Sequence, residues 1–69
     1  MNIRKVKAAI ETLETLKFKI DFECSRRSVE IGESNEPAQA KLEAERMKRM
    51  NKINDVIREL ERVYQALTN

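Results

Sequence analysis

The sequence predicts an all-α fold, an antiparallel two-helix hairpin that completes a helical bundle by self-association. Three observations lead to this prediction. The only glycine and the only proline of the 69 residues lie together in one short segment, residues 32–37. On both sides of that segment, apolar residues recur at steps of three and four, which is the spacing of one face of a helix. A chain of this length also forms only a small core, and chains of this size commonly need oligomerisation or another staple.

The first helix is expected over about residues 3–31, with Asn2 as its N-cap and Gly32 as the residue that stops it. Lys17 falls on its main apolar face, where the stem of the side chain can lie along apolar surface while the ammonium reaches water. The apolar residues of that face are Ile3, Val6, Ile10, Leu13, Leu16, Ile20 and Cys24.

A second apolar stripe runs along the same helix and consists of Phe18, Phe22 and Val29. At about 100° per residue it lies roughly 150 to 180° around the helix from the middle of the main face. A hairpin uses only one of these two faces, so the second stripe is expected to contact something else.

The loop is expected over about residues 32–36 and the second helix over about residues 37–67, within a single domain of residues 1–69. Ser34 or Asn35 can cap the second helix, and Pro37 suits its first turn because a proline there loses no intrahelical hydrogen bond. The residues assigned to its main apolar face are Ala40, Ala44, Met47, Met50, Ile53, Ile57, Leu60, Tyr64 and Leu67, with Val56 and Val63 widening the face.

When the chain folds back about the loop, two residues lie at the same level of the hairpin if their numbers add up to about 67. This rule pairs apolar residues along the hairpin, for example Ile20 with Met47. A two-helix hairpin has only one shared seam, however, and further helices are expected from another copy of the chain, as a homodimer or a larger oligomer. The residues predicted for this additional protein contact are Phe18, Phe22, Val29, Met47 and Met50.

The composition argues against catalysis and against a metal or cofactor. Histidine is absent and Cys24 is the only cysteine, which removes the usual zinc ligand sets and any internal disulfide. Cys24 lies on the main apolar face, so a buried thiol is favoured over a nucleophile. A single glycine also leaves no glycine-rich phosphate loop. We expect a non-enzymatic protein with no cofactor.

The sequence further predicts a cytoplasmic protein that does not enter a membrane. No window approaches 18 consecutive apolar residues, and the first residues have alternating charges in place of the apolar stretch of a signal peptide. The lone cysteine fits a reducing compartment.

Charge gives a second functional hypothesis. The 14 Lys and Arg residues nearly balance the 12 Asp and Glu residues, and a net charge of +2 does not by itself indicate a nucleic-acid partner. A local group of basic residues could nevertheless meet the phosphates of RNA or DNA, or a small anionic ligand held between subunits, although such a group is more often a solvated helix face. The cluster contains Arg46, and the residues of this group predicted to contact the anion are Arg26, Arg27, Lys41, Lys48, Arg49 and Lys52.

In topology the expected hairpin resembles three unrelated groups of small helical proteins. These are dimeric RNA-binding plasmid regulators, short co-chaperones of secretion-needle subunits, and small phage or regulatory inhibitors that clamp a host protein. The resemblance covers the whole chain and carries no specific motif, so no family is recognised. Our first hypothesis is a protein that acts by protein–protein binding, as an adaptor, co-chaperone or inhibitor, and the alternative is nucleic-acid binding.

Overall fold

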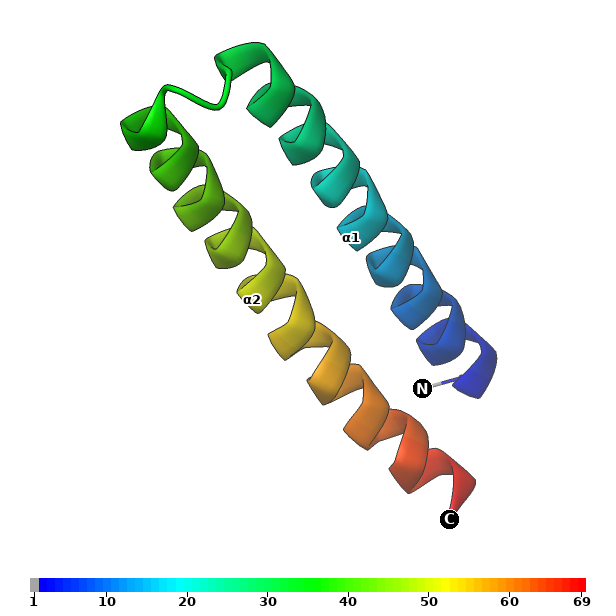
Figure 1. The fold of residues 1–69 in the computed structure, drawn as a ribbon. Coiled ribbons are helices and arrows are strands. Elements are labelled where there is room, and N and C mark those ends of the chain that lie inside the picture. The colour runs from blue at the N-terminus through cyan, green and yellow to red at the C-terminus, as the bar shows by residue number, and fades with distance from the viewer. Residues whose placement is uncertain (1) are drawn as a thin grey trace.

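The computed structural model describes residues 2–69 as an antiparallel hairpin of two helices (Figure 1). Helix α1 spans Ile3–Ile31 and helix α2 spans Glu36–Thr68. The two helices run side by side and form a rod with extents of 51 × 15 × 13 Å. The hairpin predicted from the sequence is therefore confirmed, whereas its association with further copies stays a prediction.

Both helices have an asparagine as the N-cap residue. The side-chain oxygen of Asn2 accepts a hydrogen bond from the backbone N–H of Arg4 at 2.8 Å. Asn35 does the same for the N–H of Ala38 at 3.3 Å, and Pro37 follows in the first turn of α2. An N-cap of this kind satisfies one of the donors that the first turn of a helix leaves free. Of the two expected caps of the second helix, the structure uses Asn35.

Gly32 ends α1 and begins the turn. Its φ of 89° and ψ of 150° lie in a region that is essentially restricted to glycine. Its N–H donates to the carbonyl oxygen of Ser28 at 3.1 Å, and its own carbonyl oxygen accepts from the N–H of Asn35 at 3.3 Å. An added Cβ would meet no heavy atom within 4 Å, so the backbone conformation alone selects glycine here.

The core is a narrow seam between the helices. Its central cluster consists of Ile20, Met50, Ile53 and Ile57, with Ile10, Leu13 and Cys24 packed against it. Val6 and Leu42 are also buried. Most of this apolar contact lies in the middle of the rod and toward the end opposite the loop.

The predicted apolar face of α2 is wrong over the first half of that helix. Ala40, Ala44 and Met47 are exposed, so the expected layer of Ile20 with Met47 does not form. Of the four residues predicted for the face in this half, only Met50 is buried against α1, and the other residues that face α1 here are Gln39, Leu42 and Arg46. The physical reason is that Gln39 and Arg46 find polar partners on α1, which lets polar side chains occupy the seam.

On α1, Leu16 also departs from the predicted face, because the residue is 42% exposed. Within residues 2–69, neither helix contains a segment that is long and apolar enough to cross a membrane.

Candidate interaction surfaces

Three apolar side chains form a line along the side of α1 that faces away from α2. We call Phe18, Phe22 and Val29 the outer stripe. Their exposed fractions are 76%, 69% and 82%. Measured from the centre of the observed seam, they lie about 120 to 160° around the helix. The sequence predicted this second apolar surface, and the structure leaves it uncovered.

Phe18 stands between two open hollows on the surface of α1. One is lined by Glu14, Lys17 and Asp21 together with Phe18. The other is lined by Thr15, Lys19, Phe22 and Glu23 together with Phe18. The outer stripe is thus an apolar ridge whose borders carry charges of both signs. An apolar centre inside a polar rim is the usual anatomy of a protein–protein interface.

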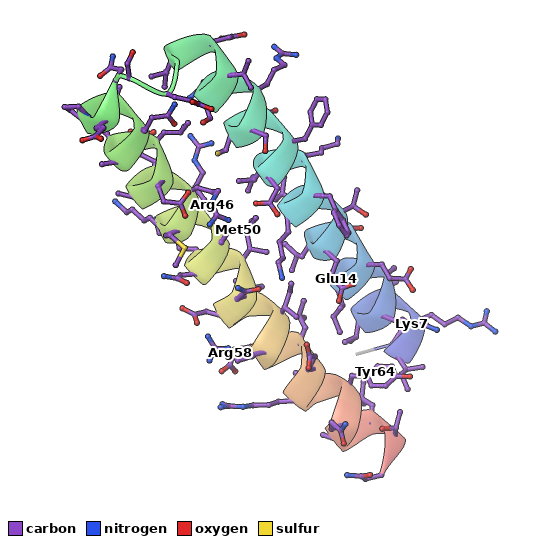
Figure 2. The ribbon with its side chains drawn as sticks, viewed as in Figure 1. Lys7, Glu14, Arg46, Met50, Arg58 and Tyr64 are labelled. Atoms are coloured by element: carbon purple, nitrogen blue, oxygen red, sulfur yellow. The ribbon has the colours of Figure 1, made fainter. Side chains whose placement is uncertain are left out.

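The two methionines predicted for the same contact lie elsewhere. Met50 is only 7% exposed and belongs to the core, where another protein cannot reach it without opening the hairpin (Figure 2). Met47 is exposed on α2, and its sulfur accepts a hydrogen bond from Arg46 Nη2 at 3.6 Å. The five residues predicted for one surface therefore separate into the outer stripe, one exposed methionine on α2 and one core methionine.

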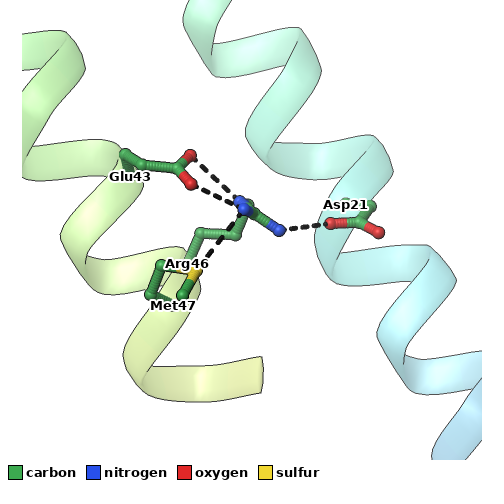
Figure 3. Close-up of polar contacts among 4 residues, drawn as sticks. All are labelled: Asp21, Glu43, Arg46 and Met47. Carbon is green, nitrogen blue, oxygen red and sulfur yellow. Dashed lines mark hydrogen bonds and ion pairs between the residues drawn. The ribbon is translucent and has the colours of Figure 1, made fainter. Parts of the chain in front are cut away.

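Arg46 is the one charged side chain that bridges the two helices in the described chain, and it makes a cluster with two carboxylates (Figure 3). Its Nη1 lies 3.1 Å from Asp21 Oδ1 on α1. Its Nε donates to Glu43 Oε2 at 3.0 Å, and its Nη2 donates to the other oxygen of the same carboxylate. The hydrogen bonds with Glu43 and then Asp21 raise the pKa of Arg46, and the bond from Arg46 lowers the pKa of Glu43.

Two carboxylates neutralise Arg46, so this residue does not contribute a free positive charge to the basic group beside it. Lys41, Lys48 and Lys52 remain exposed, and none of them makes a salt bridge with residues 2–69. They lie about 120 to 160° from the seam, on the side of α2 that faces away from α1. The three lysines form one line, as the sequence predicted.

The remaining basic residues of the predicted group are not on this line. Arg26 lies on the outer side of α1, with its Nε 4.0 Å from Glu30, and it shares a shallow hollow with Arg27 and two glutamates. Arg49 is exposed on α2 but lies only about 60° from the seam. The structure therefore does not bring the predicted anion-binding residues together into one patch.

Gln39 is a polar contact that the sequence did not reveal. Its Nε2 donates to the carbonyl oxygens of Ser28 at 2.8 Å and Gly32 at 3.0 Å, while its Oε1 accepts from the hydroxyl of Ser28 at 2.7 Å. The only available signal was its spacing, since Gln39, Arg46 and Ile53 are seven residues apart and repeat on one helix face.

A hollow of about 390 Å³ lies between these contacts, lined by Cys24, Leu42 and the polar side chains around them. No buried side-chain nitrogen or oxygen in residues 2–69 lacks a hydrogen-bond partner, and no group of acidic or cysteine side chains there has the arrangement of a metal site. In this hollow Ser28 binds Gln39, and Arg46 binds both Asp21 and Glu43, so we assign it a structural role.

Comparisons with models of known protein families, with curated proteins and with solved structures find no significant match to this chain. The functional argument therefore depends on the surfaces described above.

Proposed function

We propose that this chain is a non-enzymatic protein that acts by binding another protein through the outer stripe of α1. The supporting observation is the exposure of Phe18 and Phe22, two aromatic side chains one turn apart that take no part in the hairpin core. Burying one such side chain is worth about 1.5–3 kcal/mol. Because the hairpin does not use this free energy for folding, it is available for binding.

The partner that fits this surface is a protein with an apolar groove that accepts one face of a helix. Phe18, Phe22 and Val29 occupy one line on a single helix and span about 16 Å at 1.5 Å per residue. Anchors in such a line are the signature of helix-in-groove binding. Packing against α2 holds α1 helical before the partner arrives, which lowers the entropy lost on binding. An adaptor, co-chaperone or inhibitor works in this way.

Photo-crosslinking tests the proposal. The photoreactive residue p-benzoylphenylalanine replaces Phe18 or Phe22 in the full chain, and the protein is irradiated in the cells that produce it. Ala44 is the control position because it is exposed on the outer side of α2. We expect a discrete adduct with one protein from positions 18 and 22 and its absence from position 44.

The captured protein is then purified and titrated with the wild type and with Phe18→Ser/Phe22→Ser. Two aromatic anchors predict a loss of affinity of at least about 100-fold for the double variant. Circular dichroism must show that the variant keeps the helical content of the wild type. The proposal is rejected if positions 18 and 22 give no adduct, if position 44 gives the same adduct, or if the double variant binds the captured protein with unchanged affinity.

Binding of a nucleic-acid backbone is the second candidate, and the line of Lys41, Lys48 and Lys52 supports it. We place it second because the structure neutralises Arg46 and leaves Arg26 on the other helix. Its test is the fluorescence anisotropy of a labelled RNA hairpin and a labelled DNA duplex at several salt concentrations. Affinity that falls steeply with salt and is lost in Lys48→Glu/Lys52→Glu supports this function; no binding at low salt contradicts it. An oligomer that holds a small anion depends on the same lysines.

A further inference from the structure

We infer that a second copy of this chain packs against a different apolar surface of the hairpin and leaves the outer stripe free. We call this surface the apolar flank. Its exposed members are Leu16, Val56 and Leu67, with exposed fractions of 42%, 49% and 44%. The half-buried residues beside them are Ala9, Leu60 and Val63.

The apolar flank combines residues of both helices on one side of the hairpin. At about 100° per residue, Leu16 lies roughly 80° from the centre of the seam on α1, and Val56 lies roughly 80° from the centre of the seam on α2. Both offsets run in the same rotational sense. When two helices run antiparallel, residues that are offset from the seam in the same rotational sense lie on the same side of the pair.

The opposite side of the hairpin provides a check on this geometry. Asp21 and Glu43 are offset from their seams in the other sense, and Arg46 binds both of them at once. They therefore share the opposite, polar side. The polar side covers the seam with charged groups. The apolar flank exposes the aliphatic edge of the seam to water in the half of the hairpin away from the loop, and nearer the loop the same side carries Arg49.

The surface area of the chain argues that the hairpin packs against something large. The hairpin exposes 5669 Å². A compact monomer of 8.1 kDa exposes about 4,500 Å², so this chain exposes about 1,200 Å² more. A standard interface buries about 800 Å² on each partner, and obligate homodimers bury more. Covering one long side of the rod removes an area of the size that a stable dimer needs.

The chemistry of the flank favours a second copy as the occupant. Leu16, Val56 and Leu67 are aliphatic, like the side chains that fill the core of a helical bundle, whereas the outer stripe presents aromatic anchors. The flank is built from both helices of one layer, and a two-fold axis through it places the same aliphatic residues against each other. The product is a four-helix bundle whose two outer stripes both face solvent.

Light scattering coupled to size-exclusion chromatography tests this inference on the full chain over a wide range of concentrations. We expect the wild type at twice the mass of 8.1 kDa. Val56→Glu puts a charge into the interface and is expected to raise the dissociation constant of the dimer at least about 100-fold. Ala44→Glu, at an exposed position on the outer side of α2, and Phe18→Ser/Phe22→Ser are the matched controls, and both should remain dimeric.

A milder variant, Leu16→Ala/Val56→Ala, guards against simple loss of folding, because alanine has the highest helix propensity and both positions are exposed in the single hairpin. It should weaken the dimer while circular dichroism shows intact helices at high concentration. A monomeric wild type overturns the inference. So does a dimer that survives both flank variants, or one that only Phe18→Ser/Phe22→Ser dissociates. The crosslinking test of the outer stripe uses other positions, so either proposal can fail alone.

Discussion

Gln39 shows how one polar side chain can belong in an apolar seam. The carbonyl oxygens of Ser28 and Gly32 at the end of α1 each accept one backbone N–H and can accept a second hydrogen bond. Gln39 reaches across and donates to the carbonyl oxygens of Ser28 and Gly32, while the hydroxyl of Ser28 donates back to it. The amide of Gln39 thereby joins α2 to the end of α1 through hydrogen bonds and not through apolar contact.

Replacing Gln39 by alanine should therefore lower the free energy of unfolding by about 1–2 kcal/mol, since its three hydrogen bonds are lost and the half-buried carbonyl groups keep only their backbone donors. Urea denaturation at fixed protein concentration measures this change. Gln65→Ala makes the same chemical change at an exposed position on the same helix, and it should stay within about 0.5 kcal/mol of the wild type. Equal effects of the two substitutions would show that the three hydrogen bonds contribute nothing.

Glu43 gives the hairpin a predictable response to acid. The hydrogen bond from Arg46 lowers the pKa of Glu43 below its ordinary value of 4.5. A carboxyl group with a lowered pKa stabilises the folded state above the pKa of the unfolded chain, and this contribution is lost as the pH falls through the lowered value. The midpoint temperature of thermal unfolding, measured from neutral pH down into the acid range, should therefore decrease once the pH drops below about 5.

Glu43→Gln isolates this contribution because the amide keeps the size of the side chain and does not titrate in this range. The variant should show a smaller loss of stability on acidification than the wild type. Glu59→Gln is a useful comparison, since Glu59 binds Arg62 on the same helix and the pair is largely exposed. If Glu43→Gln and the wild type lose stability in parallel, the lowered pKa of Glu43 does not contribute.

At the scale of the helices, the sequence predicted the features that depend only on residues close together in the chain. Asparagine caps, the glycine stop and the spacing of apolar residues are local signals, and the observed helices begin and end within one residue of the expected bounds. The outer stripe was also predictable, because Phe18 and Phe22 lie opposite the seam of a single helix.

The face that α2 turns toward α1 was not predictable in its first half. Apolar spacing favoured Ala40, Ala44 and Met47, whereas Gln39 and Arg46 read as surface residues. Their partners Ser28 and Asp21 are 11 and 25 residues away along the chain. Only the folded hairpin brings these groups together, so the sequence could not separate Met50 in the core from Met47 on the surface.

The two methionines provide a direct test of this face. Met50→Ala removes a core side chain and should cost about 2–4 kcal/mol of unfolding free energy. Met47→Ala removes an exposed side chain, 47% accessible, and should change stability by less than about 0.5 kcal/mol. Both substitutions change helix propensity equally, and thermal unfolding compares them. A cost at Met47 as large as the cost at Met50 would restore the face predicted from the sequence, which contains both methionines.

The whole molecule is a thin rod and not a sphere. Its radius of gyration is 15.8 Å, whereas a compact domain of this length has about 11 Å. A single layer of two helices cannot surround a core, and buried residues are accordingly confined to the seam between them.

Small-angle X-ray scattering should distinguish the ways in which two rods can associate. If the apolar flanks meet, the mass doubles while the maximum dimension stays close to the length of one hairpin, because the rods lie alongside each other. End-to-end contact would give a maximum dimension near twice that length. Measurement above and below the dissociation constant, with Val56→Glu as the monomeric reference, supplies the comparison.

The polar contacts near the loop also have a consequence for folding kinetics. Closing a short loop costs less entropy than closing a long one. The bonds between Ser28 and Gln39 join residues 11 apart, while the apolar cluster joins residues as distant as Ile10 and Ile57. Folding should therefore start at the turn and proceed toward the open end. In stopped-flow experiments, Gln39→Ala should slow folding, whereas Ile57→Val should mainly speed unfolding. The hydrogen bonds that set the alignment of the helices then form early, and the apolar contacts that supply most of the stability form late.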